Sequence, residues 1–227
     1  LKKMKMDVFS KNPPNWTKDE ILKEFNKFIK IYDERPIKDN VGGMKYPHMF
    51  ALYFLLIKIK PDFIVESGTW RGQGTWLIEE ILPEVKILSI DINLNRRKYI
   101  SKKAEYSTID FSNQNFLNLP KNSLVLFECH KNAIDRFKQA KFFGFKHVVY
   151  GDNYPVGRGD CYTFKHAIAN TGFKRSITLL DIIKANIFLL KELIKKKFIK
   201  NYTNKLDLFK LRLNDVDSGK VDFDLLN

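Results

Sequence analysis

Acidic side chains that could hold a ligand recur where short apolar runs of the sequence end. They are Glu66, Asp91, Glu128 and Asp152. The apolar runs alternate with stretches of helical periodicity, a pattern that predicts parallel strands covered on both faces. Ligands bind such sheets at the carboxyl ends of the strands. We therefore expect these acids to lie along one functional edge.

A glycine-rich turn follows the first of these strands and precedes a predicted helix. Gly68, Gly72 and Gly74 have the spacing G-x-x-x-G-x-G, which differs from the dinucleotide pattern G-x-G-x-x-G. Glycines let the backbone turn sharply and approach a ligand, and the helix N-terminus offers free N–H groups. Asp91, after the next strand, could accept both hydroxyls of a ribose. The sequence thus predicts a nucleoside pocket, and the alternative is a structural turn with two solvated acids.

Oxygen ligands follow two later strands that we expect to be neighbours. Glu128 follows one strand, and Asp152 and Asn153 follow the other. Hard oxygen ligands suit Mg²⁺, and two carboxylates held close together favour a cation between them. These three residues are therefore a candidate magnesium site. In the alternative interpretation, Glu128 pairs with His130 and the Asp-Asn pair caps a turn before Pro155.

The elements that must position these residues can be read from periodicity and capping signals. A capping box at Thr17 and Glu20 begins a helix that extends to about Tyr32, and a second helix is predicted over 48–58. The predicted strands cover 63–66, 86–91, 106–110, 123–128 and 147–152, and the helices between them cover 75–82, 96–104 and 133–143. This order predicts an α/β fold with a doubly wound, mostly parallel, Rossmann-like sheet.

The chain divides into three predicted parts. Residues 1–43 form an N-terminal helical extension, residues 44–213 form the Rossmann-like domain with a basic C-terminal helix, and residues 214–227 form a tail. With 44% hydrophobic and 14% aromatic residues, the chain is not of the disordered class. Its two cysteines exclude a disulfide framework. No apolar run reaches the length of a membrane span, and we expect a reduced, cytoplasmic location.

The net charge of +14 raises the question of nucleic-acid binding. Residues 174–212 carry 11 basic against 3 acidic side chains, which is more than half of this excess. Three interpretations stay open for them: a solvated helix end, a surface for an anionic substrate or lipid, and a nucleic-acid surface. No aromatic-interleaved motif supports the last of these.

The segment from Ile64 to Gly72, Ile-Val-Glu-Ser-Gly-Thr-Trp-Arg-Gly, resembles the first motif of class I S-adenosylmethionine-dependent methyltransferases. It is most similar to the branch of cephalosporin hydroxylase-like and macrocin- and rhamnosyl-O-methyltransferase-like proteins. Asp91 stands where that family has its second-strand acid. The resemblance covers residues 44–165. It implies cofactor contacts from Glu66, Gly68, Thr69 and Gly72 to the methionine moiety, from Asp91 to the ribose and from Asp110 to the adenine amine.

The later strands resemble those of the metal-dependent catechol O-methyltransferase-like enzymes. Asp152-Asn153 matches their Asp-Asn pair, while Glu128 stands where they have Asp. Lys131 falls where their general-base lysine lies, and His130 competes with it because imidazole titrates near neutrality.

The combined prediction is an S-adenosylmethionine-dependent methyltransferase-like protein. Its acceptor would be a small hydroxylated molecule, a sugar or another metabolite, methylated on oxygen with or without the help of magnesium. The alternatives are a non-catalytic nucleoside-binding protein of the same fold and an RNA methyltransferase. The sequence leaves open whether the chain forms a homo-oligomer.

Overall fold

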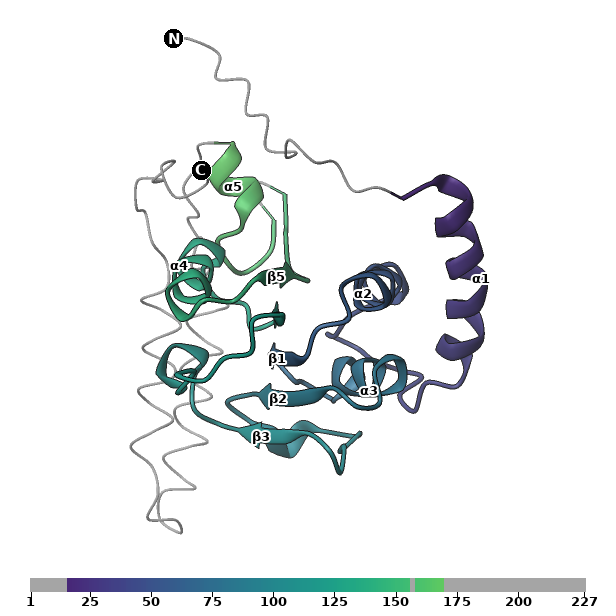
Figure 1. Ribbon diagram of the computed structural model, residues 1–227. Helices are drawn as coiled ribbons and strands as arrows, with labels where there is room; N and C mark the ends of the chain where they lie inside the picture. Colours follow the sequence, from purple (N-terminus) through teal and green to yellow (C-terminus); the bar gives the residue numbers. More distant parts are fainter. Residues whose placement is uncertain (1–15, 156–157, 170–227) are drawn as a thin grey trace, which may run out of the picture. The chain divides into compact units, whose positions relative to one another are not determined.

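The computed structural model describes residues 16–155 and 158–169 (Figure 1). The basic segment 174–212 and the tail 214–227 lie outside the described residues, so their predicted roles stay predictions. Among the helices of the described chain, none is both long and apolar enough to cross a membrane.

Chain contacts divide the protein into two compact units, which are described separately. Among the described residues, the first unit contains 16–129 and 136–152, and the second contains 130–135, 153–155 and 158–169. The described part of the predicted N-terminal extension, residues 16–43, falls in the same unit as the sheet.

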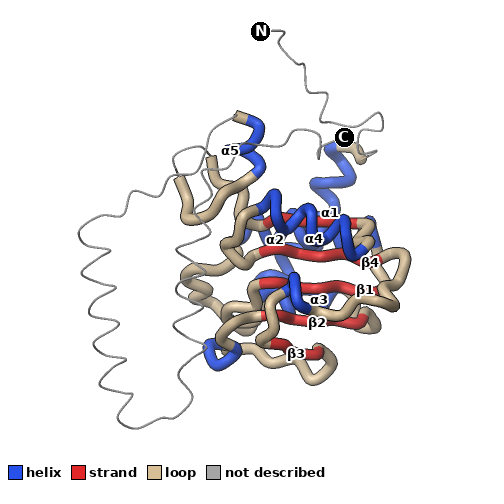
Figure 2. Tube along the Cα trace, turned by 90° about the vertical axis from the view of Figure 1, so that its left-hand side faces the viewer, coloured by secondary structure: helices blue, strands red, loops and turns tan. Residues whose placement is uncertain are grey.

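A five-stranded sheet forms the centre of the first unit, with the strand order β3-β2-β1-β4-β5 (Figure 2). The strands are β1 (Phe63–Ser67), β2 (Lys86–Ile90), β3 (Glu105–Ser107), β4 (Ser123–Phe127) and β5 (His147–Tyr150). Every neighbouring pair is parallel. The strand order reverses beside β1, so the point between β1 and β4 is a topological switch point. The predicted doubly wound α/β fold is confirmed.

Helices cover both faces of this sheet. They are α1 (Lys18–Asp33), α2 (Tyr46–Ile59), α3 (Gln73–Ile81) and α4 (Ala133–Phe143), with α5 (Phe164–Ile168) in the second unit. In Figure 1, α2 and α3 lie on one face with α1 outside them, and α4 lies on the other. Two short 3₁₀ turns, η1 (Leu94–Arg96) and η2 (Phe111–Asn113), follow the ends of β2 and β3.

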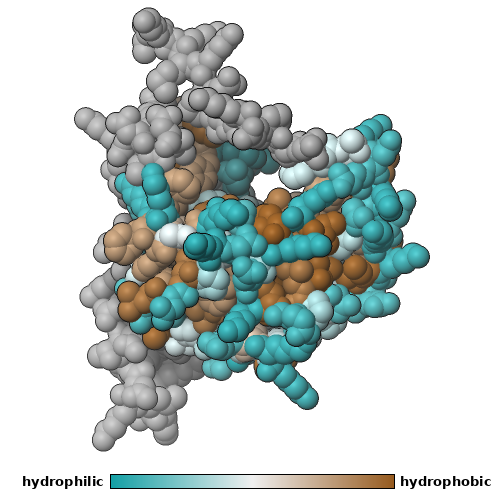
Figure 3. Space-filling model, viewed as in Figure 1, coloured by the Kyte–Doolittle hydropathy of each residue, from teal (hydrophilic) through white to brown (hydrophobic). Residues whose placement is uncertain are grey.

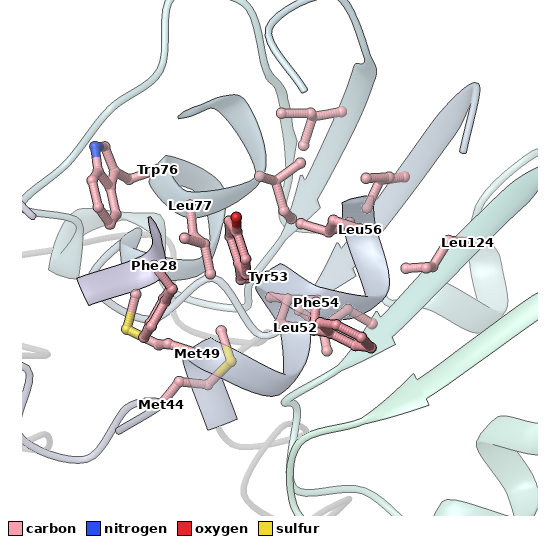
Figure 4. Packing of buried hydrophobic residues seen from close by; sticks show 14 residues of the cluster. Phe28, Met44, Met49, Leu52, Tyr53, Phe54, Leu56, Trp76, Leu77 and Leu124 are labelled. Atoms are coloured by element: carbon pink, nitrogen blue, oxygen red, sulfur yellow. The ribbon is translucent and has the colours of Figure 1, made fainter. Parts of the chain in front are cut away.

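The core on the first face joins the N-terminal helices to the sheet (Figure 4). Phe28 of α1 is fully buried, and α2 contributes Met49, Leu52 and Leu56, each at most 2% exposed. Full burial of a side chain of this size contributes about 1.5–3 kcal/mol. The opposite core includes Val65, Ile90, Phe111, Val125, Phe127, Ala140 and Phe145. The central strands are thus buried on both faces, which explains their continuous apolar runs.

The prediction of a helix over 96–104 is wrong. Only η1 forms there, and Arg97 is already extended with φ −62° and ψ 132°. The backbone N–H groups of Lys98 and Tyr99 donate instead to the carbonyl oxygen of Arg71, at 2.9 and 3.1 Å. These donors are used to hold the glycine turn, so they cannot serve an α-helix.

Candidate functional site

The turn between β1 and α3 has backbone conformations that favour glycine. Gly68 has φ +111° and Gly72 has φ +88°. A Cβ at residue 68 would overlap the backbone of Glu128, and a Cβ at residue 72 would overlap the carbonyl oxygen of Tyr99. Both positions therefore need glycine for its conformation and for space. The N–H of Gly68 donates to the carbonyl oxygen of Ile90 at 2.8 Å, which ties the turn to the end of β2.

The carboxylate of Glu66 lies beneath this turn and is only 1% exposed. Its Oε2 accepts hydrogen bonds from the hydroxyls of Thr75 at 2.5 Å and of Ser89 at 2.6 Å. Burial raises the pKa of Glu66 to about 7, although the two hydroxyl donors act in the opposite direction. Glu66 thus supports the first turn of α3 from inside the protein.

Thr69 also points inward, where its Oγ1 lies 2.7 Å from Oγ of Ser89. Its side chain is 2% exposed, and Ser89 is fully buried. Together with Glu66 and Thr75 they form a closed network of hydroxyls around one carboxylate. Neither Ser89 nor Thr75 was predicted from the sequence to belong to the site. The only sequence signal for Ser89 is a polar residue inside the apolar run Lys86–Ile90.

Asp91 lies at the carboxyl end of β2 and is partly exposed. Its Oδ2 accepts the backbone N–H of Trp70 at 2.8 Å, and its Oδ1 accepts that of Asn93 at 2.9 Å. A carboxylate has about four acceptor positions, so Asp91 keeps capacity for further donors. It combines a structural contact to the glycine turn with an accessible acceptor.

Apolar side chains flank this acid at the carboxyl edge of the sheet. Ile92 follows Asp91 directly and is 47% exposed, and Ile109 follows β3 and is 55% exposed. In the view of Figure 3, patches of hydrophobic surface lie between the hydrophilic side chains. Neither isoleucine could be predicted from the sequence, because a lone apolar residue after an acid gives no local signal.

Asp110 lies just before η2 and forms a two-pronged ion pair with Arg136 of α4. Nη1 of Arg136 donates to Oδ1 at 2.8 Å and Nη2 donates to Oδ2 at 2.6 Å. Ser112 adds donors from its backbone and its hydroxyl to Oδ1. Burial alone would raise the pKa of Asp110, but the adjacent guanidinium holds that pKa well below its usual range. Asp110 is thus strongly engaged with the protein itself.

The carboxylate of Glu128 lies at the end of β4, directly against the backbone at the end of β5. A Cβ at Gly151 would overlap it, and Asp152 is the next residue. The N–H of Gly151 donates to the carbonyl oxygen of Phe127 at 3.1 Å, which holds the two strand ends together. Two carboxylates therefore follow neighbouring strands. In the part of the chain that the structure describes, no group of three or more His, Cys, Asp and Glu residues is arranged to hold a metal ion.

The second unit contains Asn153 and both candidate bases. Oδ1 of Asn153 accepts the backbone N–H of Lys165 at 3.3 Å. His130 has φ +50°, and its Nδ1 lies 2.7 Å from Oδ1 of Asp160. Lys131 is partly exposed. The structure therefore pairs His130 with a carboxylate that sequence reasoning had not linked to it.

No protein-family model matches the sequence, and no curated protein sequence matches it either. Solved structures do match. One is "cmcI-N160 SAH", with 14% identity, a TM-score of 0.43, and coverage of 63% of this chain and 79% of that chain. Another is a putative caffeoyl-CoA O-methyltransferase from Staphylococcus aureus, with 17% identity, a TM-score of 0.40, and coverage of 60% and 66%.

A third match is the SAH-bound Podospora anserina methyltransferase PaMTH1, with 12% identity and a TM-score of 0.40. It covers 55% of this chain and 56% of that chain. All three scores are below 0.5, so the function proposed below depends on the chain's own residues.

Proposed function

We propose that the chain is an S-adenosylmethionine-dependent methyltransferase acting on a hydroxyl oxygen of a small acceptor. The observation that carries the proposal is the glycine turn after β1, held beside an accessible acid, Asp91, at the end of β2. Gly68 and Gly72 give the turn its positive φ angles, and the turn lies beside the switch point of the sheet. This combination suits a nucleoside with a short polar extension.

The proposed cofactor residues divide into two kinds. Asp91 would accept the ribose hydroxyls with its remaining acceptor capacity, and Ile92 and Ile109 would provide apolar surface for a flat base. Gly68 and Gly72 would accommodate the methionine moiety. The predicted contacts of Glu66, Thr69 and Asp110 are proposed to be indirect. These three side chains shape the turn and the end of β3 through their own hydrogen bonds.

The cofactor would supply the methyl group, and the protein would supply orientation and an acceptor for the hydroxyl proton. His130 and Lys131 follow β4 in the sequence and stay the proposed bases. The carboxylate of Asp160 favours His130, because a carboxylate beside Nδ1 fixes the orientation of the imidazole ring. Replacing Asp160 with Asn would then lower kcat more than it raises KM.

Magnesium is a second, separable part of the proposal. Glu128 and Asp152 follow adjacent strands, and one carboxylate oxygen of each is buried, which fits a hard cation. Asn153, the third ligand that the sequence predicts, lies in the second unit, and its part in the set stays a prediction from the sequence. When bound, the ion would lower the pKa of a coordinated hydroxyl. A sugar or another hydroxylated metabolite is the proposed acceptor, as the family resemblance implies.

Calorimetry with S-adenosylmethionine tests the central claim. We expect saturable binding by the wild-type chain and at least a tenfold weaker affinity for Asp91→Ala, because two hydroxyl hydrogen bonds are lost. Asp62→Ala is the matched control. It removes an exposed acid just before β1, at the other end of that strand, and leaves the affinity unchanged. No binding at millimolar cofactor would overturn the proposed function.

A further inference from the structure

The loop between α1 and α2 is anchored at both ends and exposed in its middle. Ile37 is 3% exposed and Met44 is 8% exposed, and Met44 belongs to the core cluster shown in Figure 4. Between them, Val41 is 64% exposed. The core thus fixes the two ends of the loop, and its exposed middle needs contacts of its own to be held in place.

The middle of this loop is bound to the glycine turn. The indole N–H of Trp70 donates to the carbonyl oxygen of Val41 at 2.9 Å. The ring of Trp70 also lies against Gly42, where a Cβ would be 3.4 Å from the nearest ring carbon. One aromatic side chain of the turn therefore makes both a hydrogen bond and a packing contact with the loop.

Asp39 adds a polar contact to the same pair of elements. Its carbonyl oxygen accepts a hydrogen bond from Nη1 of Arg71 at 2.7 Å. Its carboxylate lies 3.6 Å from the same guanidinium and 3.1 Å from Nζ of Lys98. The backbone of Lys98 in turn donates to the carbonyl oxygen of Arg71. Three segments that are distant in the sequence thus meet at one residue of the turn.

The turn needs such support because the backbone of Trp70 adopts a conformation that residues other than glycine rarely adopt. Its φ is +49°, in the left-handed region. Its backbone N–H is held by Asp91 and its side chain by Val41. Residues in this conformation persist only where the surrounding structure holds them. Release of the indole would therefore allow the turn to relax toward other conformations.

We propose that residues Asp39–Gly43 form a clasp that holds the glycine turn in its binding conformation. Trp70 and Arg71 are then positioning residues, whose side chains act on the loop, and the segment joining α1 to α2 sets the affinity for the nucleoside. This inference rests on the proposed function for its effect on affinity. Its structural part, the tie between loop and turn, does not.

Two variants and two measurements test the clasp. Trp70→Phe keeps an aromatic side chain but loses the indole and its N–H donor, and Asp39→Ala removes the carboxylate that binds Lys98. We expect amide hydrogen exchange in residues 68–72 to become about threefold to tenfold faster, as for the loss of one hydrogen bond. The Kd for S-adenosylhomocysteine, measured by calorimetry, should rise by a similar factor.

Lys27→Gln is the matched control, because it removes an exposed ion pair with Glu24 on α1. It should change neither measurement. Unchanged exchange in both Trp70→Phe and Asp39→Ala would overturn the clasp, even if the Kd rose, since a direct contact to the ligand would then explain the affinity. If the wild type binds no S-adenosylhomocysteine, the proposed function fails, and the exchange rates alone decide whether the clasp exists.

Discussion

The acids on the two sides of the sheet's carboxyl edge have different surroundings. Beside β1, β2 and β3, each acid accepts hydrogen bonds from the protein's own groups. The donors are Thr75 and Ser89 for Glu66, Trp70 and Asn93 for Asp91, and Arg136 and Ser112 for Asp110. Beside β4 and β5, the carboxylate of Glu128 packs against Gly151, next to a second acid, Asp152.

This difference shows that an acid at a strand end is not in itself a ligand-binding group. Glu66 and Asp110 are both engaged with the protein, yet their pKa values move in opposite directions. Glu66 is buried among neutral hydroxyls, so burial raises its pKa, whereas Arg136 lowers that of Asp110. On the side of β4 and β5, Glu128 and Asp152 are the two acids for which a bound cation is proposed.

The largest effect is expected where the two sides meet, at Gly68. Gly68→Ala would place a Cβ into the backbone of Glu128 at φ +111°, and we expect a loss of about 3 kcal/mol or more. Gly144→Ala is the control, because Gly144 also has positive φ, at +85°, but no atom within 4 Å of the added Cβ. It should cost only about 1 kcal/mol. Equal costs in urea denaturation would contradict the close approach.

A pH effect of about 3 kcal/mol is expected from Glu66. The unfolded chain releases this proton near the ordinary pKa of 4.5 and the folded chain near 7, so stability falls as the pH rises between these values. Glu66→Gln stays neutral and should lack this decline. Urea denaturation from pH 4.5 to 8 should therefore show the stability advantage of the wild type over Glu66→Gln shrinking with pH. Parallel stability curves would show that Glu66 titrates normally.

The ion pair between Asp110 and Arg136 should be worth about 2 kcal/mol in a double-mutant cycle. Arg136 is 4% exposed, so removing Asp110 leaves a buried guanidinium without its acid. We expect Asp110→Asn to destabilise the chain strongly, and Asp110→Asn to cost much less when Arg136→Met is already present. A coupling energy near zero would instead leave Asp110 free to serve a ligand.

The smallest expected effect is magnesium binding beside β4 and β5. At ten times its Kd, Mg²⁺ should stabilise the wild type by about 1.4 kcal/mol, seen as a rise in Tm. Asp152→Asn should abolish this rise. Asp91→Asn, which changes an acid on the other side of the sheet, should keep it. A rise in Tm that survives Asp152→Asn would place the ion elsewhere.

Much of the fold could be predicted from local patterns. Apolar runs marked β1, β2, β4 and β5, and Thr17 does cap α1, accepting the N–H of Glu20 at 3.2 Å. The strand predicted over 106–110 is shorter in the structure, where β3 covers only Glu105–Ser107. The prediction failed over 96–104, where the backbone donors of Lys98 and Tyr99 bind Arg71. No local pattern reveals such a partner, because it lies in another element.

In the candidate site, too, local patterns predicted the residues but not their contacts with distant elements. Residue types and spacing identified the glycine turn, the acids after the strands and the candidate bases. The sequence could not show that Asp110 forms an ion pair within the protein, since Arg136 lies 26 positions away. It also could not show what holds Trp70, since Val41 lies 29 positions away.

The sequence by itself therefore determined the order of strands and helices and the chemistry present at each strand end. Periodicity and capping are local properties, so they can be read along the chain. Only the tertiary structure decided what each of these groups contacts. Burial and the approach of distant donors set the pKa of Glu66, the pairing of Asp110 and the support of Trp70 by the N-terminal loop. These depend on which elements pack together, and packing is decided by the whole core.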